Sequence, residues 1–324
     1  MQIIDAHIHF IGNHPDSLAL LEELDVKLLN VCAALGGADW RKLMWHDYRA
    51  LAREQPARFA WCTAFDLPDF QEAGYADRVL RGLEQDFADG AVACKVWKNI
   101  GMELKDPAGN FVMIDHPVFA PIFEYLAERG KTLLMHIGEP LACWQPLDVQ
   151  NPHYGYYSQN PQWHMYGRSD VPGHAAQVAA RDRVLENHPR LRVVGAHLGS
   201  LEFDVREIGR RLDRYPNFAV DTSARLADLA FQDGDRVREF IGKYSDRVLF
   251  GTDIVAYQPQ AQMTAEDRGT LLRAARQNYH RQLAYFGGTA PVEILNRQIP
   301  GLGLPEQLME KLFRTNAQAW YPGI

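Results

Sequence analysis

Eight short apolar runs, each followed by a segment of helical periodicity, are the feature that most limits how this chain can fold. Such runs are typical of strands buried in a parallel sheet, and they lie at Ile3–Phe10, Val26–Ala33, Arg58–Phe65, Ala91–Trp97, Thr132–Ile137, Arg192–His197, Phe218–Thr222 and Val248–Asp253. The helical segments lie at Asp16–Leu24, Leu43–Gln55, Ala73–Phe87, Pro117–Arg129, His174–His188, Leu201–Arg214, Arg236–Tyr244 and Thr270–Phe286. Strand and helix alternate throughout, which predicts an α/β fold with a parallel sheet.

The architecture that fits this alternation is a single (β/α)8 TIM barrel over residues 1–324. No Ser/Gly-rich linker or change of composition divides the 324 residues, so we expect one domain. An open, doubly wound sheet is the alternative. That fold usually carries a glycine-rich phosphate turn after its first strand, whereas this chain has Phe10-Ile11-Gly12-Asn13-His14 there.

Two segments exceed the minimal repeat. Gly138–Gly173 follows the fifth run and is rich in aromatic residues. A loop after a barrel strand lies at the face that carries active sites, so this insert is expected either to cover a site or to pack on a second copy in a homodimer. Pro305–Trp320 is expected to form an extra C-terminal helix.

Composition excludes several partners. The net charge is −7, with 34 Lys and Arg scattered along the chain, so nucleic acid is not an expected partner. No apolar stretch is long enough to cross a membrane, and the first residues show neither the cationic nor the apolar part of a signal peptide. The four cysteines are widely spaced, as expected for reduced thiols in the cytoplasm.

The first run ends in a pair of histidines. In an extended strand, Asp5, His7 and His9 lie on one face, and Ile4, Ala6, Ile8 and Phe10 form the opposite face, which we expect to contact the helices. Two imidazoles at the carboxyl end of one strand can reach a single metal ion. The H-x-H pattern alone is a weak signal.

Three further runs also end in residues that ligate metals. His136 follows the fifth run's apolar core, His197 ends the sixth and Asp253 ends the eighth. Each of these histidines alone would be read as a hydrogen-bonded core residue. Burying so many titratable groups at one rim without a cation would be costly, so together they predict a metal site.

Because of these strand-end residues, the chain resembles the amidohydrolase superfamily, and within it the amidohydrolase-related branch that includes aminocarboxymuconate-semialdehyde decarboxylase-like proteins. The matching pieces, in order, are Asp5-Ala6-His7-Ile8-His9, His136-Ile137-Gly138-Glu139, Ala196-His197-Leu198-Gly199, Gly251-Thr252-Asp253 and Asn316-Ala317. They span nearly the whole chain. The set is specific for the superfamily and much less so for the substrate.

The resemblance implies that His7, His9, His136 and Asp253 bind one divalent metal ion, zinc or alternatively manganese. Such an ion lowers the pKa of a bound water toward about 7 and polarises a carbonyl. Asp253 would then move the proton, and His197 would stabilise the oxyanion or complete a second site.

Lys95 has two interpretations. It shares a face of the fourth run with Ala93 and Trp97. Binuclear members of the superfamily use a carboxylated lysine at this strand as a bridging ligand, which would imply two ions. A buried lysine more often pairs with a carboxylate or an anionic substrate.

Substrate contacts are expected from the segments after strands 5 and 7. The candidates are Glu139, Arg168, Arg225 and Trp144. An arginine could hold a substrate carboxylate through two parallel hydrogen bonds. Glu139 could instead orient a ligand histidine, and each charge could also be an ordinary solvated one.

The leading functional hypothesis is a metal-dependent hydrolase that attacks a small amide, lactone or ester, acidic or cyclic in character. A non-oxidative decarboxylase using the same metal site is the alternative. A barrel that binds a ligand without chemistry is the third hypothesis, disfavoured because all five expected site positions are filled.

Overall fold

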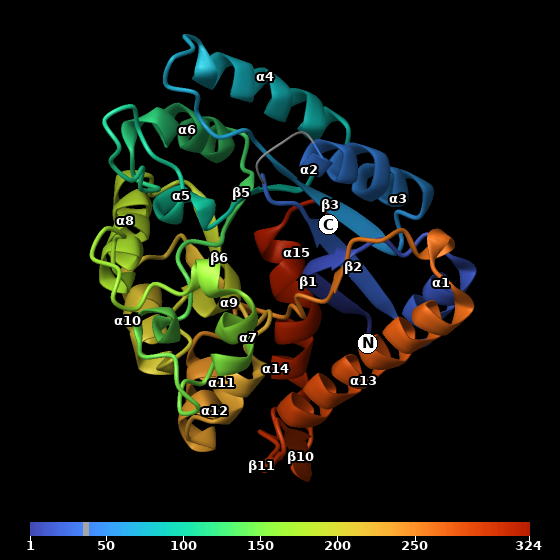
Figure 1. Cartoon of the computed structure of the whole chain (residues 1–324). Helices are drawn as coiled ribbons and strands as arrows, with labels where there is room; N and C mark the ends of the chain where they lie inside the picture. The colour runs from blue at the N-terminus through green and yellow to red at the C-terminus, as the bar shows by residue number, and fades with distance from the viewer. Residues whose placement is uncertain (35–38) are drawn as a thin grey trace.

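A sheet of parallel strands forms the centre of the molecule in the computed structural model, which describes residues 1–34 and 39–324 (Figure 1). Within those residues the strands of this sheet follow the order β8-β7-β6-β5-β4-β3-β2-β1-β9. They are β1 (Ile3–Phe10), β2 (Val26–Val31), β3 (Phe59–Ala64), β4 (Ala93–Val96), β5 (Thr132–Met135), β6 (Arg192–Gly195), β7 (Phe218–Asp221), β8 (Val248–Leu249) and β9 (Val255–Ala256). Each of the eight predicted runs therefore contains a strand, and the strands follow one another in the predicted order.

The segment that follows β8 closes the sheet against β1. The Ala6 amide donates to the Phe250 carbonyl at 3.0 Å, and the Asp253 amide donates to the His7 carbonyl at 2.8 Å. The segment that follows β8 thus runs beside β1, and its continuation, β9, pairs with the end of β1. The α/β TIM-barrel-like fold is confirmed.

Helices surround the strands (Figure 1). The longer ones are α1 (Pro15–Glu23), α4 (Tyr75–Ala88), α6 (Ala120–Glu128), α8 (His174–Asn187), α10 (Val205–Arg214), α12 (Gly234–Lys243) and α13 (Ala265–Gly287). A continuous helical stretch comprises α2 (Asp39–Lys42), a π-helical turn (Leu43–Tyr48) and α3 (Arg49–Glu54). Side-chain caps fix several starts: Asp204 accepts from the Arg206 amide before α10, and Thr264 accepts from the Asp267 amide before α13.

Shorter helical turns follow the strands or lie within connections. They are α5 (Asn99–Met102), 3₁₀ turns at Pro117–Phe119, Leu141–Trp144, Pro161–Trp163 and Gln260–Gln262, α7 (Tyr154–Gln159), α9 (Ala196–Gly199), α11 (Leu226–Ala230), α14 (Glu306–Glu310), a π-helical turn (Lys311–Thr315) and α15 (Asn316–Trp320). The predicted insert therefore contains α7 and two of the 3₁₀ turns. Residues 306–320 are helical without a break.

The two faces of the strands belong to two apolar cores. The outer core joins the strands to the helices and includes Ile3, Ile8 and Phe10 of β1. The inner core takes residues from all eight barrel strands, among them Ile4 and Ala6 of β1. The expectation that Ile4 and Ala6 face the helices is therefore wrong. The pairing of β1 with β2 shifts register between Asp5 and Ile8, which turns His7 inward after Ala6 and breaks the strict alternation.

The C-terminal helix α15 closes the floor of the inner core. Ala317, Trp320 and Tyr321 pack against the inward-facing strand residues, and Figure 1 shows α15 within the ring of strands. The side-chain Nδ2 of Asn316 donates to the carbonyl of Val248 at 2.7 Å, at the amino end of β8. The amino ends of the strands are thus covered by the chain's own last helix, which leaves the carboxyl ends for a site.

A hairpin of β10 (Pro291–Ile294) and β11 (Arg297–Pro300) follows α13, and the sequence patterns did not predict it. The four cysteines are all free and buried. Within residues 1–34 and 39–324, no helix combines the length and hydropathy that crossing a membrane requires.

Candidate metal centre

Polar side chains on or directly after four strands meet at the carboxyl ends of the sheet. His7 and His9 lie on β1 and Lys95 on β4, whereas His136 directly follows β5. Asp221 is the last residue of β7. The carboxyl ends of parallel barrel strands point to one face, so residues distant in sequence share this rim.

His7, His9 and Asp253 form the tightest group of predicted ligands. One ligand atom from each lies within 4.8 Å of the others. Asp253 Oδ1 lies 3.6 Å from His7 Nε2 and 3.5 Å from His9 Nε2. Two ligands at 2.0–2.2 Å from a tetrahedral zinc ion are about 3.4 Å apart. The donor types and their spacing therefore fit a divalent metal ion.

His136 lies next to this group but is not part of it. Its ring packs edge-on against that of His197, with 4.3 Å between centroids, and against Trp97 at 6.4 Å. The His197 ring in turn lies 4.8 Å from that of His7. The structure thus brings three of the four predicted ligands together and places His136 beside His197.

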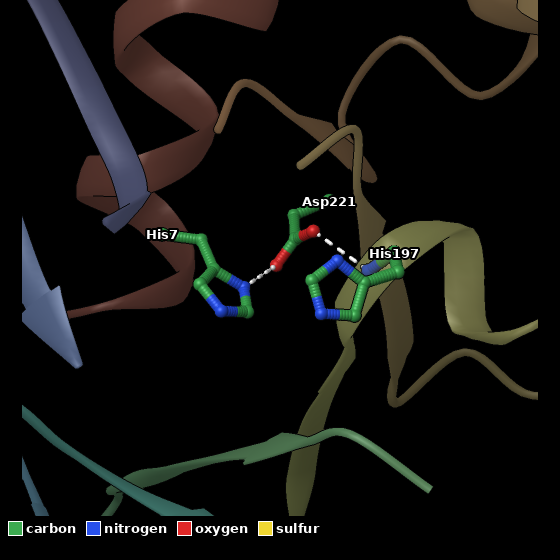
Figure 2. Close-up of side chains that lie close together, drawn as sticks. All are labelled: His7, His197 and Asp221. Atoms are coloured by element: carbon green, nitrogen blue, oxygen red, sulfur yellow. Dashed lines mark hydrogen bonds and ion pairs between the residues drawn. The ribbon is translucent and has the colours of Figure 1, made fainter. Parts of the chain in front are cut away.

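Asp221 connects two of the histidines (Figure 2). Its Oδ2 lies 2.9 Å from His7 Nδ1, and its Oδ1 accepts from the His197 amide at 2.9 Å. Ser223 Oγ lies 3.1 Å from His7 Nδ1 and 2.9 Å from His197 Nδ1. Figure 2 shows the Asp221 carboxylate between the two residues. Sequence reasoning missed Asp221, although it ends an apolar run just as Asp253 does.

Lys95 faces the first histidine. It is 2% exposed, and its Nζ lies 2.9 Å from His7 Nε2. Burial lowers the pKa of Lys95, and the negative charge of Asp253 partly opposes this effect. These contacts place the Lys95 side chain at the rim beside His7.

The histidines are electrically neutral groups in this environment. Burial lowers the pKa values of His7, His9, His136 and His197 well below the ordinary value for imidazole, and neighbouring positive charges add to this effect. Neutral imidazole is the form that binds metal ions.

Asp253 has the opposite perturbation. Burial raises the pKa of Asp253 to about 6, although Lys95 and Arg225 oppose the shift. Its side chain is nevertheless 23% exposed. A carboxyl group with this pKa and some access to solvent can exchange a proton near neutral pH.

The candidate substrate-contacting residues differ in their burial and in their distance from the metal centre. Glu139 is buried against Lys98 in an ion pair, and its Oε2 accepts from Tyr157 at 3.1 Å. The positive charge of buried Arg225 lowers the pKa of His7, so its guanidinium lies near the centre. Arg168 is exposed and paired with Asp170 at 3.1 Å.

Aromatic rings contact the ammonium group of Lys98. Its ammonium lies 3.9 Å from the centroid of the Trp163 ring and 5.2 Å from that of Trp97. The Trp97 and Trp163 rings contact each other at 5.2 Å. Trp144, the candidate from the insert, packs instead against His174 at 5.5 Å. Sequence reasoning gave no role to Trp97, whose place directly after β4 was the available signal.

Solved structures of similar fold were found at low sequence identity. An uncharacterised TIM-barrel protein from Bordetella bronchiseptica gives a TM-score of 0.58 at 15% identity, over 100% of this chain and 99% of that one. A 2,6-dihydroxybenzoate decarboxylase gives 0.55 at 16%, over 99% of each chain. A 4-oxalomesaconate hydratase from Rhodopseudomonas palustris gives 0.52 at 14%, over 99% of this chain and 96% of that one. These similarities concern the fold.

Curated protein sequences gave no match to the chain. The model of the amidohydrolase family, by contrast, matches residues 4–323. Apart from Ile3, the match includes every strand of the sheet, and it includes each of the strand-end residues described above. The chain therefore belongs to the amidohydrolase family.

Proposed function

We propose that this protein is a metal-dependent hydrolase of small carbonyl compounds. The observation that carries the proposal is the spacing of three ligand atoms. Asp253 Oδ1 lies 3.6 Å from His7 Nε2 and 3.5 Å from His9 Nε2. Membership of the amidohydrolase family supports it. In this proposal His7, His9 and Asp253 hold zinc, or alternatively manganese, and His136, which lies beside them, is the fourth ligand that the family resemblance implies. When bound, such an ion acts as a Lewis acid, acidifying water and polarising a carbonyl.

The residues of the chain supply the proton transfers. Asp253, whose carboxylate is 23% exposed at the centre, would accept the proton of the attacking water and return it to the leaving group. His197 Nδ1 lies 2.9 Å from the Ser223 carbonyl, which can only accept a hydrogen bond. The neutral ring therefore carries its lone pair at Nε2. In that state His197 accepts protons, and stabilising an oxyanion would require it to gain a second proton.

The number of ions depends on Lys95. With a free amine, Lys95 supplies no ligand and the centre holds one ion, whose binding at His7 Nε2 would replace the 2.9 Å contact between that nitrogen and Lys95 Nζ. If the amine were carboxylated, the new carboxylate would become a bridging ligand and the centre would hold two. Mass spectrometry of the intact protein at neutral pH, compared with Lys95→Arg, distinguishes the two states.

Decarboxylation is the second candidate reaction. The position of Asp253 at the centre suits it, since a carboxyl group there could deliver a proton to carbon. A solved structure of similar fold is a 2,6-dihydroxybenzoate decarboxylase. Incubation with aromatic acids, followed by measurement of CO₂, compared with a panel of lactones, esters and amides, separates the two reactions. Release of CO₂ without turnover of the panel would replace the leading proposal.

Metal content tests both enzymatic proposals. Protein purified without a histidine tag should contain about one equivalent of zinc or manganese, or regain it when either is added. Well under one equivalent, not restored by these metals, would contradict both and favour a barrel that only binds a ligand.

The remaining contacts are proposed as follows. The chain forms one domain over residues 1–324 and acts on a small-molecule substrate, whose anionic group would contact Arg225. Tyr154, Tyr156 and Tyr166 of the insert are each more than 40% exposed. Such an aromatic surface suits a homodimer, which light scattering on the purified protein would detect.

A further inference from the structure

Asp221, the last residue of β7, and Ser223, two residues later, contact His7 and His197. Asp221 Oδ2 lies 2.9 Å from His7 Nδ1, and Ser223 Oγ lies about equally close to Nδ1 of both rings. All four side chains are buried. The contacts involve Nδ1 in each case, so they determine which ring nitrogen carries the proton.

The partners of His7 specify its tautomer. A carboxylate can only accept hydrogen bonds, so His7 Nδ1 must carry a proton and donate it to Asp221. On the other side of the ring, Lys95 Nζ lies 2.9 Å from His7 Nε2. In its protonated form Lys95 can only donate, so it requires an unprotonated nitrogen at that distance. Both neighbours therefore require Nδ1–H and a lone pair at Nε2, the atom that faces Asp253.

The partners of His197 lead to the same tautomer. The Ser223 carbonyl lies 2.9 Å from His197 Nδ1 and accepts its proton. Ser223 Oγ is hydrogen-bonded to Asp221 Oδ1, so its own proton goes to the carboxylate. The hydroxyl oxygen is then free to accept from the imidazole N–H groups. Each proton in the cluster thus has one assignment that satisfies every contact.

We propose that Asp221 and Ser223 are positioning residues that hold His7 and His197 with their Nε2 lone pairs toward the metal centre. The functional part of this inference rests on the proposed metal-dependent activity. Asp221 also contacts the backbone of His197, because its Oδ1 accepts a hydrogen bond from the His197 amide at 2.9 Å. That residue has a left-handed backbone, with φ of 56°, and the hydrogen bond helps to hold it there.

Asp221→Asn is the informative substitution. Three donors converge on Asp221 Oδ1: the amides of His197 and Ser223 and the Ser223 hydroxyl. The amide oxygen of asparagine will occupy that place, which directs its NH₂ group at His7 Nδ1. The His7 proton must then move to Nε2, and the lone pair needed by a metal ion is lost.

The tautomers can be measured in the wild-type protein without metal or substrate. Selective ¹⁵N labelling of histidine, with difference spectra from His7→Gln and His197→Gln for assignment, reports the protonation of each ring nitrogen. We expect Nδ1–H and unprotonated Nε2 for both residues in chelator-treated protein. A proton on Nε2 of His7 would overturn the proposal, whether or not any variant folds.

Zinc affinity then tests the consequence. Asp221→Asn should move the His7 proton to Nε2 and weaken zinc binding 10–100-fold, the usual loss when a ligand histidine loses its carboxylate partner. Asp86→Asn is the matched control, because Asp86 is a buried carboxylate that accepts from Trp45 Nε1 at 2.9 Å, away from the centre. Its zinc affinity should equal that of the wild type.

Two outcomes separate this inference from the proposed function. If the wild type shows the expected tautomers but binds no zinc, the metal-dependent function fails while the assignment of the protons stands. If the wild type binds zinc and a folded Asp221→Asn binds it equally well with Nδ1 of His7 still protonated, the positioning role is wrong.

Discussion

At the scale of single residues, the backbone at two strand ends is strained. His197 and Asp253 have φ values of 56° and 59°, in the left-handed region that costs most side chains about 1–3 kcal/mol. Local hydrogen bonds compensate, since the Asp253 amide donates to the His7 carbonyl and the His197 amide donates to Asp221. Asparagine and aspartate tolerate this conformation better than other residues with side chains.

Asp253→Asn should therefore keep the fold and lose the chemistry. We expect kcat/KM to fall by about 10²–10⁴-fold, the usual contribution of a group that transfers protons, with little change in the melting temperature of the metal-free protein. Asp25→Asn is the matched control, because Asp25 is also left-handed, with φ of 49°, and pairs with Arg58 instead. Undiminished turnover in Asp253→Asn would exclude Asp253 as the residue that transfers the proton.

Asp5 gives a prediction for stability against pH. Burial raises the pKa of Asp5 to about 7, and hydrogen bonds from Thr252 and Tyr279 only partly oppose this. The unfolded chain has a carboxyl pKa of about 3.9. Between pH 4 and 7 the folded state therefore holds the extra proton at Asp5, so the contribution of this group to the free energy of unfolding falls as pH rises, by up to about 4 kcal/mol.

The measurement is denaturant unfolding of metal-free protein from pH 4 to 7, compared with Asp5→Asn. An asparagine can keep the same contacts, because the hydroxyls of Thr252 and Tyr279 can turn to accept from its NH₂ group. The variant should lose this part of the pH dependence. An equal slope in both proteins would show that Asp5 is ionised throughout.

At the scale of elements, local signals predicted most helices and strands but not the hairpin of β10 and β11. Its turn, Leu295-Asn296, has φ of 47° and 62°. Two left-handed residues form the tight turn that hairpins favour, but leucine is rare there, so no Asn-Gly-type signal marked it. The insert also has short helices that periodicity does not reveal. Contacts such as the pairing of Lys98 with Glu139 hold its start in place.

The C-terminal helix α15 provides a prediction at this scale. Trp320 is buried in the inner core, and its indole Nε1 donates to the Asp246 carbonyl at 2.8 Å. Trp320→Ala should lower the free energy of unfolding by about 3–5 kcal/mol, because it opens a cavity in that core. Urea unfolding measures the loss.

The neighbouring residue supplies the control. Tyr321 is equally buried, but among the described residues its hydroxyl has no hydrogen-bond partner. Tyr321→Phe should therefore be neutral or stabilising by about 1 kcal/mol. If both variants had wild-type stability, α15 would not be part of the core.

At the scale of the whole molecule, the order of strands could be predicted because each strand carries its own apolar pattern. The grouping of metal-ligating side chains at the rim of the barrel could be predicted only in part. Topology brings the strand ends to one face, which places His7, His9 and Asp253 together. The separate packing of His136 against His197 depends on ring orientations that no spacing encodes. The inward turn of His7 depends on a local register shift.

Metal binding should stabilise the whole fold. At a zinc concentration of 100 times Kd, a ligand that binds only the folded state adds about 2.7 kcal/mol. For a chain of this size the melting temperature should rise by about 5 °C. Thermal unfolding with zinc, manganese or a chelator measures the shift, and His9→Gln should abolish it. An equal shift in that variant would locate the metal elsewhere.

The position of α15 also affects the order in which the protein can fold during synthesis. Ala317, Trp320 and Tyr321 are translated after every barrel strand, yet they complete the core on which those strands pack. A nascent chain that has exposed all its strands but not this helix still lacks the floor of its barrel. Final consolidation must therefore wait until residue 321 has left the ribosome, and until then the inner faces of the strands depend on protection from aggregation.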